Sequence, residues 1–115
     1  ELVDRITADN GCVDCDLEQA SLRGISIDGA DFSEAKLIEA DLKQVNLPNA
    51  NFTEARMQRT ELEQSNLEGA VFKEARMRDA DLEKSRLKGA DFRNADLRDI
   101  DLANATIERN TLYNR

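Results

Sequence analysis

A large apolar residue recurs at every fifth position of this chain, from Leu17 to Leu112, without a gap. An α-helix cannot collect such residues on one face, because five residues advance the helix by about 500°, or about 140° past one full turn. A flat β-strand fails as well, because a step of five places successive residues on opposite faces of a sheet. We therefore expect a backbone that turns a corner once per five residues, always in the same direction. The twenty positions are Leu17, Leu22, Ile27, Phe32, Leu37, Leu42, Leu47, Phe52, Met57, Leu62, Leu67, Phe72, Met77, Leu82, Leu87, Phe92, Leu97, Leu102, Ile107 and Leu112.

A second period of twenty residues sets the number of corners in one coil. The only phenylalanines are Phe32, Phe52, Phe72 and Phe92, and they end the tetrapeptides GADF, NANF, GAVF and GADF. Twenty residues make four groups of five, so we expect four sides per coil, about five coils in the chain, and the four Phe rings stacked in one internal column. The residue two positions before each large one is Ala in twelve of the twenty cases, which is small enough to share the narrow interior.

The pentapeptides ADFSE, ADLKQ, ANFTE, ADLEK, ADFRN and ADLRD follow the pattern A(D/N)LXX. By this pattern the chain resembles the pentapeptide-repeat family over residues 15–112. The resemblance implies an all-β fold, a right-handed quadrilateral parallel β-helix (a solenoid) of about five 20-residue coils, with the Ala and the large residue both pointing inward. Residues 1–115 are expected to form one domain, with a capping helix in 1–11, the repeats in 12–112 and a tail in 113–115.

Both ends of a solenoid need covering. Residues 1–11, ELVDRITADNG, fall outside the register; Leu2, Val3 and Ile6 can share one helical face, and Gly11 is a suitable stop signal. We expect a short helix over the first coil. The last residues, ERNTLYNR, give no clear cap, so fraying, cover by Tyr113 and end-to-end stacking of the C-terminal coil on another molecule all stay open, and so does the oligomeric state.

Corners need residues that tolerate a positive φ, and glycine does so without strain. Gly24, Gly29, Gly69 and Gly89 each follow the large apolar residue by two positions, and Asn49 takes that place in its own coil. We expect these five residues to sit at corners.

Cys12 and Cys15 stand just before the first complete repeat, in the segment CVDC. They are interpreted either as two small buried residues of an imperfect first coil or as a disulfide that pins the cap. Zinc is disfavoured because two Cys without any His supply half of the usual ligands. Redox activity is disfavoured because inward burial suppresses thiolate formation.

The net charge of −8 argues against direct nucleic acid binding, which needs a basic surface. On the expected β-helix, Asp41, Glu61, Asp81 and Asp101 form a file, about 4.8 Å apart, and repulsion should raise their pKa values. This acidic file is interpreted as a solvated face, a weak cation site or a partner-binding stripe. On a neighbouring face, the row formed by Lys36, Arg56 and Arg76 is expected to be salt-bridged.

No catalytic, cofactor-binding or metal residues are predicted, and we expect no enzyme. The chain has no His for acid–base work near neutrality, no nucleophile–base motif and no Gly-rich phosphate loop. The leading hypothesis is a non-enzymatic structural or interaction module, with a protein partner that the sequence does not identify. The family resemblance implies one alternative, a DNA mimic that inhibits or protects DNA gyrase. A second alternative is weak cation binding by the acidic face.

Location depends on the two cysteines. The resemblance points to short repeat proteins of thylakoid lumens and cyanobacteria, which often start with a Cys pair, as CVDCDLEQASL does here. Periplasm or thylakoid lumen is expected if Cys12 and Cys15 are disulfide-bonded, and cytoplasm otherwise. No apolar run approaches the roughly 18 residues of a membrane span. The chain begins at Glu1 rather than Met, so a removed leader stays open.

Overall fold

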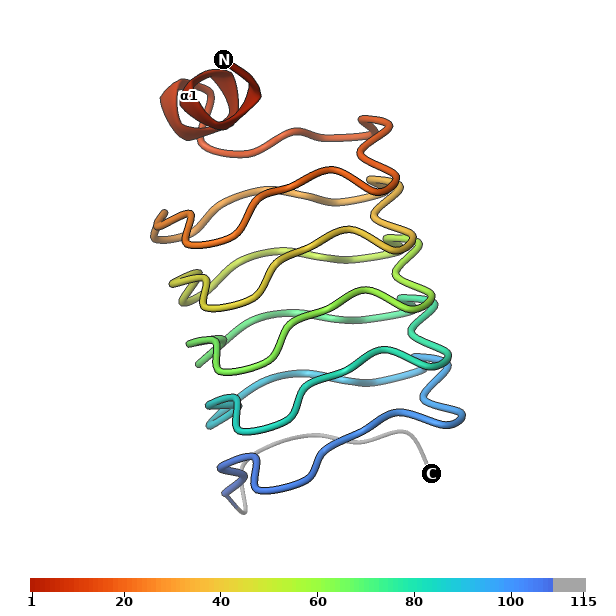
Figure 1. The fold of residues 1–115 in the computed structure, drawn as a ribbon. Helices are drawn as coiled ribbons and strands as arrows, with labels where there is room; N and C mark the ends of the chain where they lie inside the picture. Colours follow the sequence, from red (N-terminus) through yellow and green to blue (C-terminus); the bar gives the residue numbers. More distant parts are fainter. Residues whose placement is uncertain (109–115) are drawn as a thin grey trace.

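The computed structural model describes residues 1–108. One helix, α1 (Leu2–Ala8), precedes a stack of similar coils that rise along one axis (Figure 1). The coils are joined by isolated parallel bridges, each between residues twenty positions apart, for example Asp31 with Asn51 and Lys36 with Arg56. The 20-residue period is therefore present in the backbone. The count of about five coils stays a prediction, because its last register position, Leu112, lies outside the described residues.

Sheet pairing takes a reduced form in this β-helix. Only the residue before each large apolar one makes a bridge, because the next residues already turn the corner, so residues 1–108 contain no continuous strand. Hydrogen bonds between coils are nevertheless regular: the Phe32 N–H donates to the Asn51 carbonyl (2.7 Å), and the Asn51 N–H donates to the Ala30 carbonyl (2.8 Å). These bonds satisfy the main chain next to the apolar interior.

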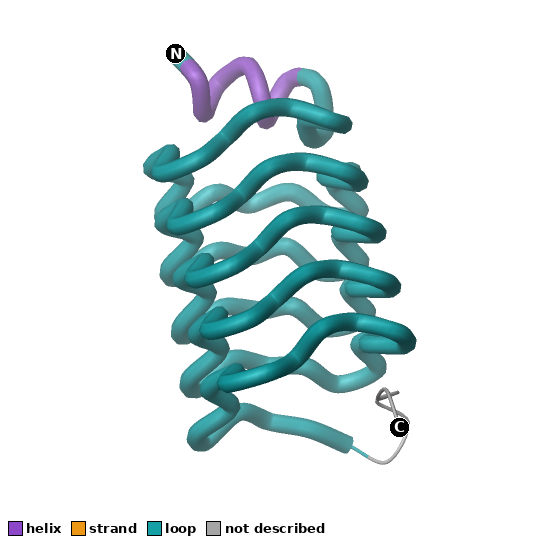
Figure 2. Tube along the Cα trace, turned by 90° about the vertical axis from the view of Figure 1, so that its right-hand side faces the viewer, coloured by secondary structure: helices purple, strands orange, loops and turns teal. Residues whose placement is uncertain are grey.

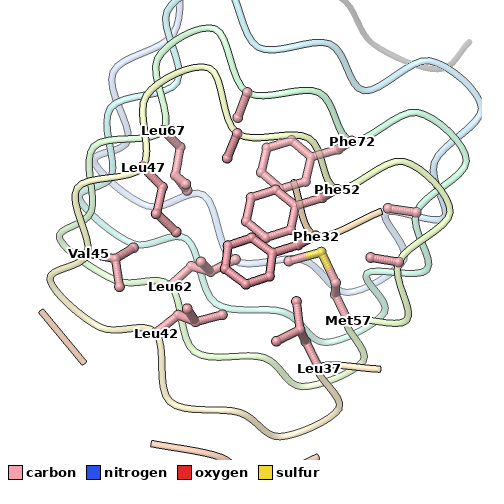
Figure 3. Packing of buried hydrophobic residues seen from close by; sticks show 14 of the residues in the cluster. Phe32, Leu37, Leu42, Val45, Leu47, Phe52, Met57, Leu62, Leu67 and Phe72 are labelled. Carbon is pink, nitrogen blue, oxygen red and sulfur yellow. The ribbon is translucent and has the colours of Figure 1, made fainter. Parts of the chain in front are cut away.

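The interior is filled by the large apolar residues and the small residues that precede them. The rings of Phe32, Phe52, Phe72 and Phe92 stack nearly parallel, with centroids 5.5, 5.1 and 4.8 Å apart. All four rings are buried. Figure 3 shows the first three in one column, with Leu42 next to Leu62 and Leu47 next to Leu67 on other sides of the coil. The side chains therefore leave no open channel along this part of the axis.

Three hydroxyl residues occupy the small inward position without breaking the core. Thr60, Ser65 and Ser85 are buried. Ser65 Oγ donates to the Leu42 carbonyl and accepts from the Val45 N–H, at 3.1 Å in each case. Ser85 Oγ likewise donates to the Leu62 carbonyl and accepts from the Ser65 N–H. Each serine thus links neighbouring coils through main-chain groups, and none of these three buried hydroxyls is left unpaired.

Gly24, Gly29, Gly69, Gly89 and Asn49 have a positive φ at corners, as expected, but other residue types adopt the same conformation. Within residues 1–108, every residue two positions after a large apolar one has a positive φ, including Glu34 (60°), Arg59 (58°) and Lys84 (61°). Most corners close with a turn hydrogen bond such as Ala35 N–H to the Phe32 carbonyl, 3.1 Å. A positive φ at the third residue is the feature of a type II turn. The ladder between coils therefore imposes the left-handed conformation on residues that do not prefer it.

Helix α1 lies across the end of the first coil, as Figure 2 shows. Ile6 is buried and Val3 packs against the core, whereas Leu2 is partly exposed. Gly11 does not end the helix as expected. The helix ends before Asn10, which has φ 56°. The Asn10 N–H donates to the Thr7 carbonyl, and the Gly11 N–H donates to the Ile6 carbonyl. This pattern is a Schellman motif with Asn10 in the left-handed position.

Gly11 instead forms the first bridge, to Asp31. A Cβ atom at Gly11 would overlap the backbone of Asp31. The glycine is therefore needed for the close approach of two main chains. At the other end, Leu97, Ile100 and Leu102 are only partly buried against the core. The expectation about Tyr113 lies outside the described residues.

Candidate functional site

The two cysteines are joined by a disulfide between Cys12 and Cys15, with Cα atoms 5.5 Å apart. Both residues are partly buried against the core. Asp14, between them, has φ 60° and forms the first corner. The disulfide therefore fixes the corner just after the cap, and the reading of two free, core-filling thiols is wrong for this structure.

The acidic file runs along one side through the bridges Asp41–Glu61, Glu61–Asp81 and Asp81–Asp101. Its first half is neutralised: Arg23 Nη2 lies 3.1 Å from Asp41 Oδ2, and Lys43 Nζ lies 3.7 Å from Glu61 Oε2. The second half has no ion pair within residues 1–108. The two halves of the file therefore differ in charge balance, which the file's regular spacing does not reveal.

Carboxylates gather in that second half. One oxygen each from Asp81, Glu83 and Asp101 lie within 4.8 Å of one another. We call these three residues the acidic patch.

The expectation that repulsion raises the pKa of every file member is wrong for Asp41. Partial burial disfavours its charged form, but hydrogen bonds from the Lys43 N–H and the Arg23 guanidinium outweigh burial and lower the pKa of Asp41. The raised pKa belongs to Glu63, beside the file. Burial is the main cause, and the charges of Asp81 and Glu61 add to it.

The basic row also departs from the expectation. Lys36, Arg56 and Arg76 have no ion pair within 4 Å among the described residues, although eight other cations do; the eight pairs are Arg23–Asp41, Lys43–Glu61, Arg59–Glu39, Arg78–Asp99, Arg86–Glu68, Lys88–Glu108, Arg93–Asp91 and Arg98–Asp96.

The register explains why two members of the row are unpaired. In three of the pairs, a residue just before a large apolar one meets the residue 18 positions earlier, in the preceding coil, as Asp41 meets Arg23. The residues 18 positions before Arg56 and Arg76 are Ile38 and Gln58. Neither residue offers a carboxylate, so these two guanidinium groups have no partner at the usual place.

A groove of about 540 Å³ separates the basic row from a row of acids. Lys36, Arg56 and Arg76 line one edge, and Glu34, Glu54 and Glu74 line the other, with Asp14 at one end. None of these acids has an ion pair within 4 Å in the described part of the chain. The basic row was expected from the sequence, but the row of acids opposite it was not. The signal was present, because an acid precedes each base by two residues and the motif recurs every twenty.

Within residues 1–108, no helix has the length or the apolar character needed to cross a bilayer.

Comparison with known families gives two matches. The family described as "Pentapeptide repeat region" matches residues 38–114, and that described as "Pentapeptide repeats (8 copies)" matches residues 12–49. No curated protein matches the chain.

Solved structures of the same kind are similar. A pentapeptide repeat protein from the Arabidopsis thaliana thylakoid lumen is 24% identical with a TM-score of 0.69. The match covers 80% of this chain and 61% of that protein's chain. The chain therefore spans about three fifths of that protein. The pentapeptide repeat protein Rfr23 from the cyanobacterium Cyanothece 51142 is 26% identical with a TM-score of 0.44, covering 96% of each chain. QnrB1, a plasmid-mediated fluoroquinolone resistance protein, is 16% identical with a TM-score of 0.37, covering 84% of this chain and 81% of its own.

The period of five, the coils twenty residues long and the match over more than half of the sequence agree with one another. This chain belongs to the pentapeptide repeat family.

Proposed function

We propose that the protein is a non-enzymatic interaction module whose acidic patch binds a basic segment of a partner protein. The β-helix supplies a rigid support, because side chains fill the interior and each coil is hydrogen-bonded to its neighbours. Solenoid proteins commonly use such a surface to bind partners.

The observation that carries this proposal is the uneven neutralisation of the acidic file. Asp41 and Glu61 already have cationic partners, whereas Asp81, Glu83 and Asp101 are grouped without one within residues 1–108. A Lys- or Arg-rich segment would relieve the repulsion among these carboxylates. Such a contact is expected to be fast and sensitive to salt.

The test is an NMR titration of the labelled protein with a decalysine peptide. The largest amide shifts are expected at residues 81–84 and 101–104. The triple variant Asp81→Asn, Glu83→Gln, Asp101→Asn should lose these shifts. The control variant Asp4→Asn, Asp9→Asn, Glu18→Gln removes the same charge elsewhere and should retain them. Equal loss in both variants would reject a localised patch.

The alternative of a gyrase-binding DNA mimic stays a prediction from the family resemblance. A supercoiling assay with purified gyrase tests it. If about micromolar protein neither inhibits gyrase nor protects it from the drug, the alternative is rejected. Weak cation binding by the acidic face stays the second alternative, supported by the carboxylates of Asp81, Glu83 and Asp101, which lie close enough together to hold a metal ion.

We also propose that the protein works in an oxidising compartment, either a periplasm or a thylakoid lumen. The Cys12–Cys15 disulfide supports this location, because such bonds persist where thiols are not kept reduced. Titration of the unfolded protein, isolated from its natural source without reductant, should find no free thiol. Two free thiols would contradict the proposal and favour the cytoplasm.

A further inference from the structure

We propose that the charged groove is a contact surface for a second copy of this chain, packed side by side and pointing in the same direction. This surface lies on a different side from the acidic patch, so the inference does not depend on the proposed function. It rests on the six charged residues that form the two rows, Lys36, Arg56 and Arg76 facing Glu34, Glu54 and Glu74.

Charged side chains without an ion pair gather in this groove. Six cations within residues 1–108 have no ion pair; three of them line this groove, and the other three, Arg5, Lys73 and Lys84, do not. Arg56, Arg76 and the three glutamates of the acidic row are exposed, and Lys36 is half-buried. Both rows are therefore open to a partner's charges.

The charges along each row are regularly spaced. Lys36, Arg56 and Arg76 follow one another through the bridges between coils, so each row repeats at the coil spacing of about 4.8 Å. A partner must offer opposite charges at the same spacing to pair with all of them. A second copy of the chain does so without any adjustment.

Two copies related by a two-fold axis can pair their rows in full. A two-fold axis parallel to the coil axis places the basic row of one copy opposite the acidic row of the other, at matching heights. Each copy then contributes three bases and three acids, giving six intermolecular ion pairs of the type Lys36 with the partner's Glu34. A two-fold axis across the coils would instead bring acid against acid. The charges therefore select the parallel arrangement.

The surroundings set the limits of this contact. Asp14, at one end of the groove, would face Asp16 of the second copy, which is unfavourable. At the other end Asp96 is already paired with Arg98 at 2.7 Å. The seven charged residues that line the groove sum to −1, against −8 for the chain, so repulsion between copies is small on this side. One side measures at most 38 by 20 Å, so the interface is no larger than the standard size of roughly 800 Å² per partner. A weak dimer is expected.

Sedimentation velocity at protein concentrations up to about 1 mM tests the inference. The wild-type chain should shift toward the dimer as concentration rises. The basic-row variant Lys36→Glu, Arg56→Glu, Arg76→Glu and the acidic-row variant Glu34→Lys, Glu54→Lys, Glu74→Lys should each remain monomeric. A 1:1 mixture of the two variants should form a heterodimer, because each now complements the other. Recovery of binding in the mixture also shows that both variants are folded.

A control variant separates local pairing from overall charge. The substitutions Arg5→Glu, Lys73→Glu and Lys84→Glu change the net charge as much as the basic-row variant does, but outside the groove. This control should dimerise like the wild type, and it should bind the acidic-row variant at least tenfold more weakly than the basic-row variant does. A wild-type chain that stays monomeric would overturn the inference, as would equal self-association of the wild type and both row variants.

Discussion

Gly11 and Gly29 both have a positive φ, 129° and 73°, but their surroundings differ. A Cβ atom at Gly29 would meet nothing within 4 Å, whereas one at Gly11 would overlap the Asp31 backbone. Corners equivalent to Gly29 are occupied elsewhere by residues such as Glu34 and Arg59. A positive φ alone therefore does not require glycine in this fold, but the close approach of two main chains does.

We predict that Gly11→Ala destabilises the protein far more than Gly29→Ala. Overlap with fixed backbone should cost about 1–3 kcal/mol beyond the cost of the positive φ, whereas Gly29→Ala should cost about 1 kcal/mol or less. Equilibrium unfolding in urea measures both values. Equal costs at the two positions would show that the first bridge can move apart freely.

Glu63 gives a second prediction at this scale. Its pKa is raised, mainly by burial and further by Asp81 and Glu61, so the folded state favours the protonated form. This contribution to stability is complete below the pKa of the unfolded chain and is lost as pH rises through the higher folded value. Glu63→Gln, which stays neutral, should therefore stabilise the protein at pH 7, by up to about 0.5 kcal/mol.

The same substitution should have no stabilising effect near pH 3, where Glu63 itself is protonated. Thermal unfolding at both pH values measures the difference. Glu18→Gln is the control, because Glu18 is exposed, and its effect should be small at both pH values. An equal gain from Glu63→Gln at pH 3 and pH 7 would mean that charge is not the cause.

At the scale of elements, α1 is too short to be stable by itself. Its seven residues fall below the roughly 12–15 that an isolated helix needs even in a favourable sequence. Packing on the first coil must hold it, mainly through Ile6, which is 2% exposed, while Leu2 is 38% exposed. The Schellman motif at Asn10 then directs the chain into the Gly11–Asp31 bridge. The helix and the first coil therefore depend on each other.

We predict that Ile6→Ala costs about 2–5 kcal/mol of unfolding free energy, the usual range for a buried aliphatic side chain. Leu2→Ala, the matched control, should cost less than about 1 kcal/mol because that side chain is already partly in water. Deletion of residues 1–9 should uncover the first coil and promote aggregation, measured by light scattering. A deletion product that is monomeric and equally stable would show that α1 is not a cap.

For the whole molecule, the coil could be predicted from sequence because every interior position is decided by side-chain size and burial. Phe32 and Phe52 sit twenty residues apart, and the bridges have the same period. The conformation of corners such as Glu34 and Lys84 could not be predicted, because no local preference of those residues indicates a left-handed φ. The charge pairs depend on how side chains reach between coils. Glu61 meets Lys43, 18 residues earlier, whereas Arg56, at the same place in its pentapeptide, has Ile38 there and no ion pair within residues 1–108.

The Phe column couples successive coils, so the cost of a substitution should depend on its place in the stack. Within residues 1–108, Phe52 lies between two rings, at 5.5 and 5.1 Å, whereas Phe32 has one stacked ring neighbour, Phe52. Each stacked pair is worth about 0.5–1.5 kcal/mol beyond burial. Phe52→Leu should therefore destabilise the protein by about 0.5–1.5 kcal/mol more than Phe32→Leu, since both substitutions remove a fully buried ring and differ by one stacked pair.

Urea unfolding followed by circular dichroism, with hydrogen exchange as a second probe, measures this difference. If the coils unfold together, both probes should give the same unfolding free energy for each variant. If they unfold separately, Phe52→Leu should weaken hydrogen-exchange protection only in the coils around it. Equal costs for Phe32→Leu and Phe52→Leu would show that the rings contribute through burial alone, and that contact between stacked rings adds nothing to the coupling of the coils.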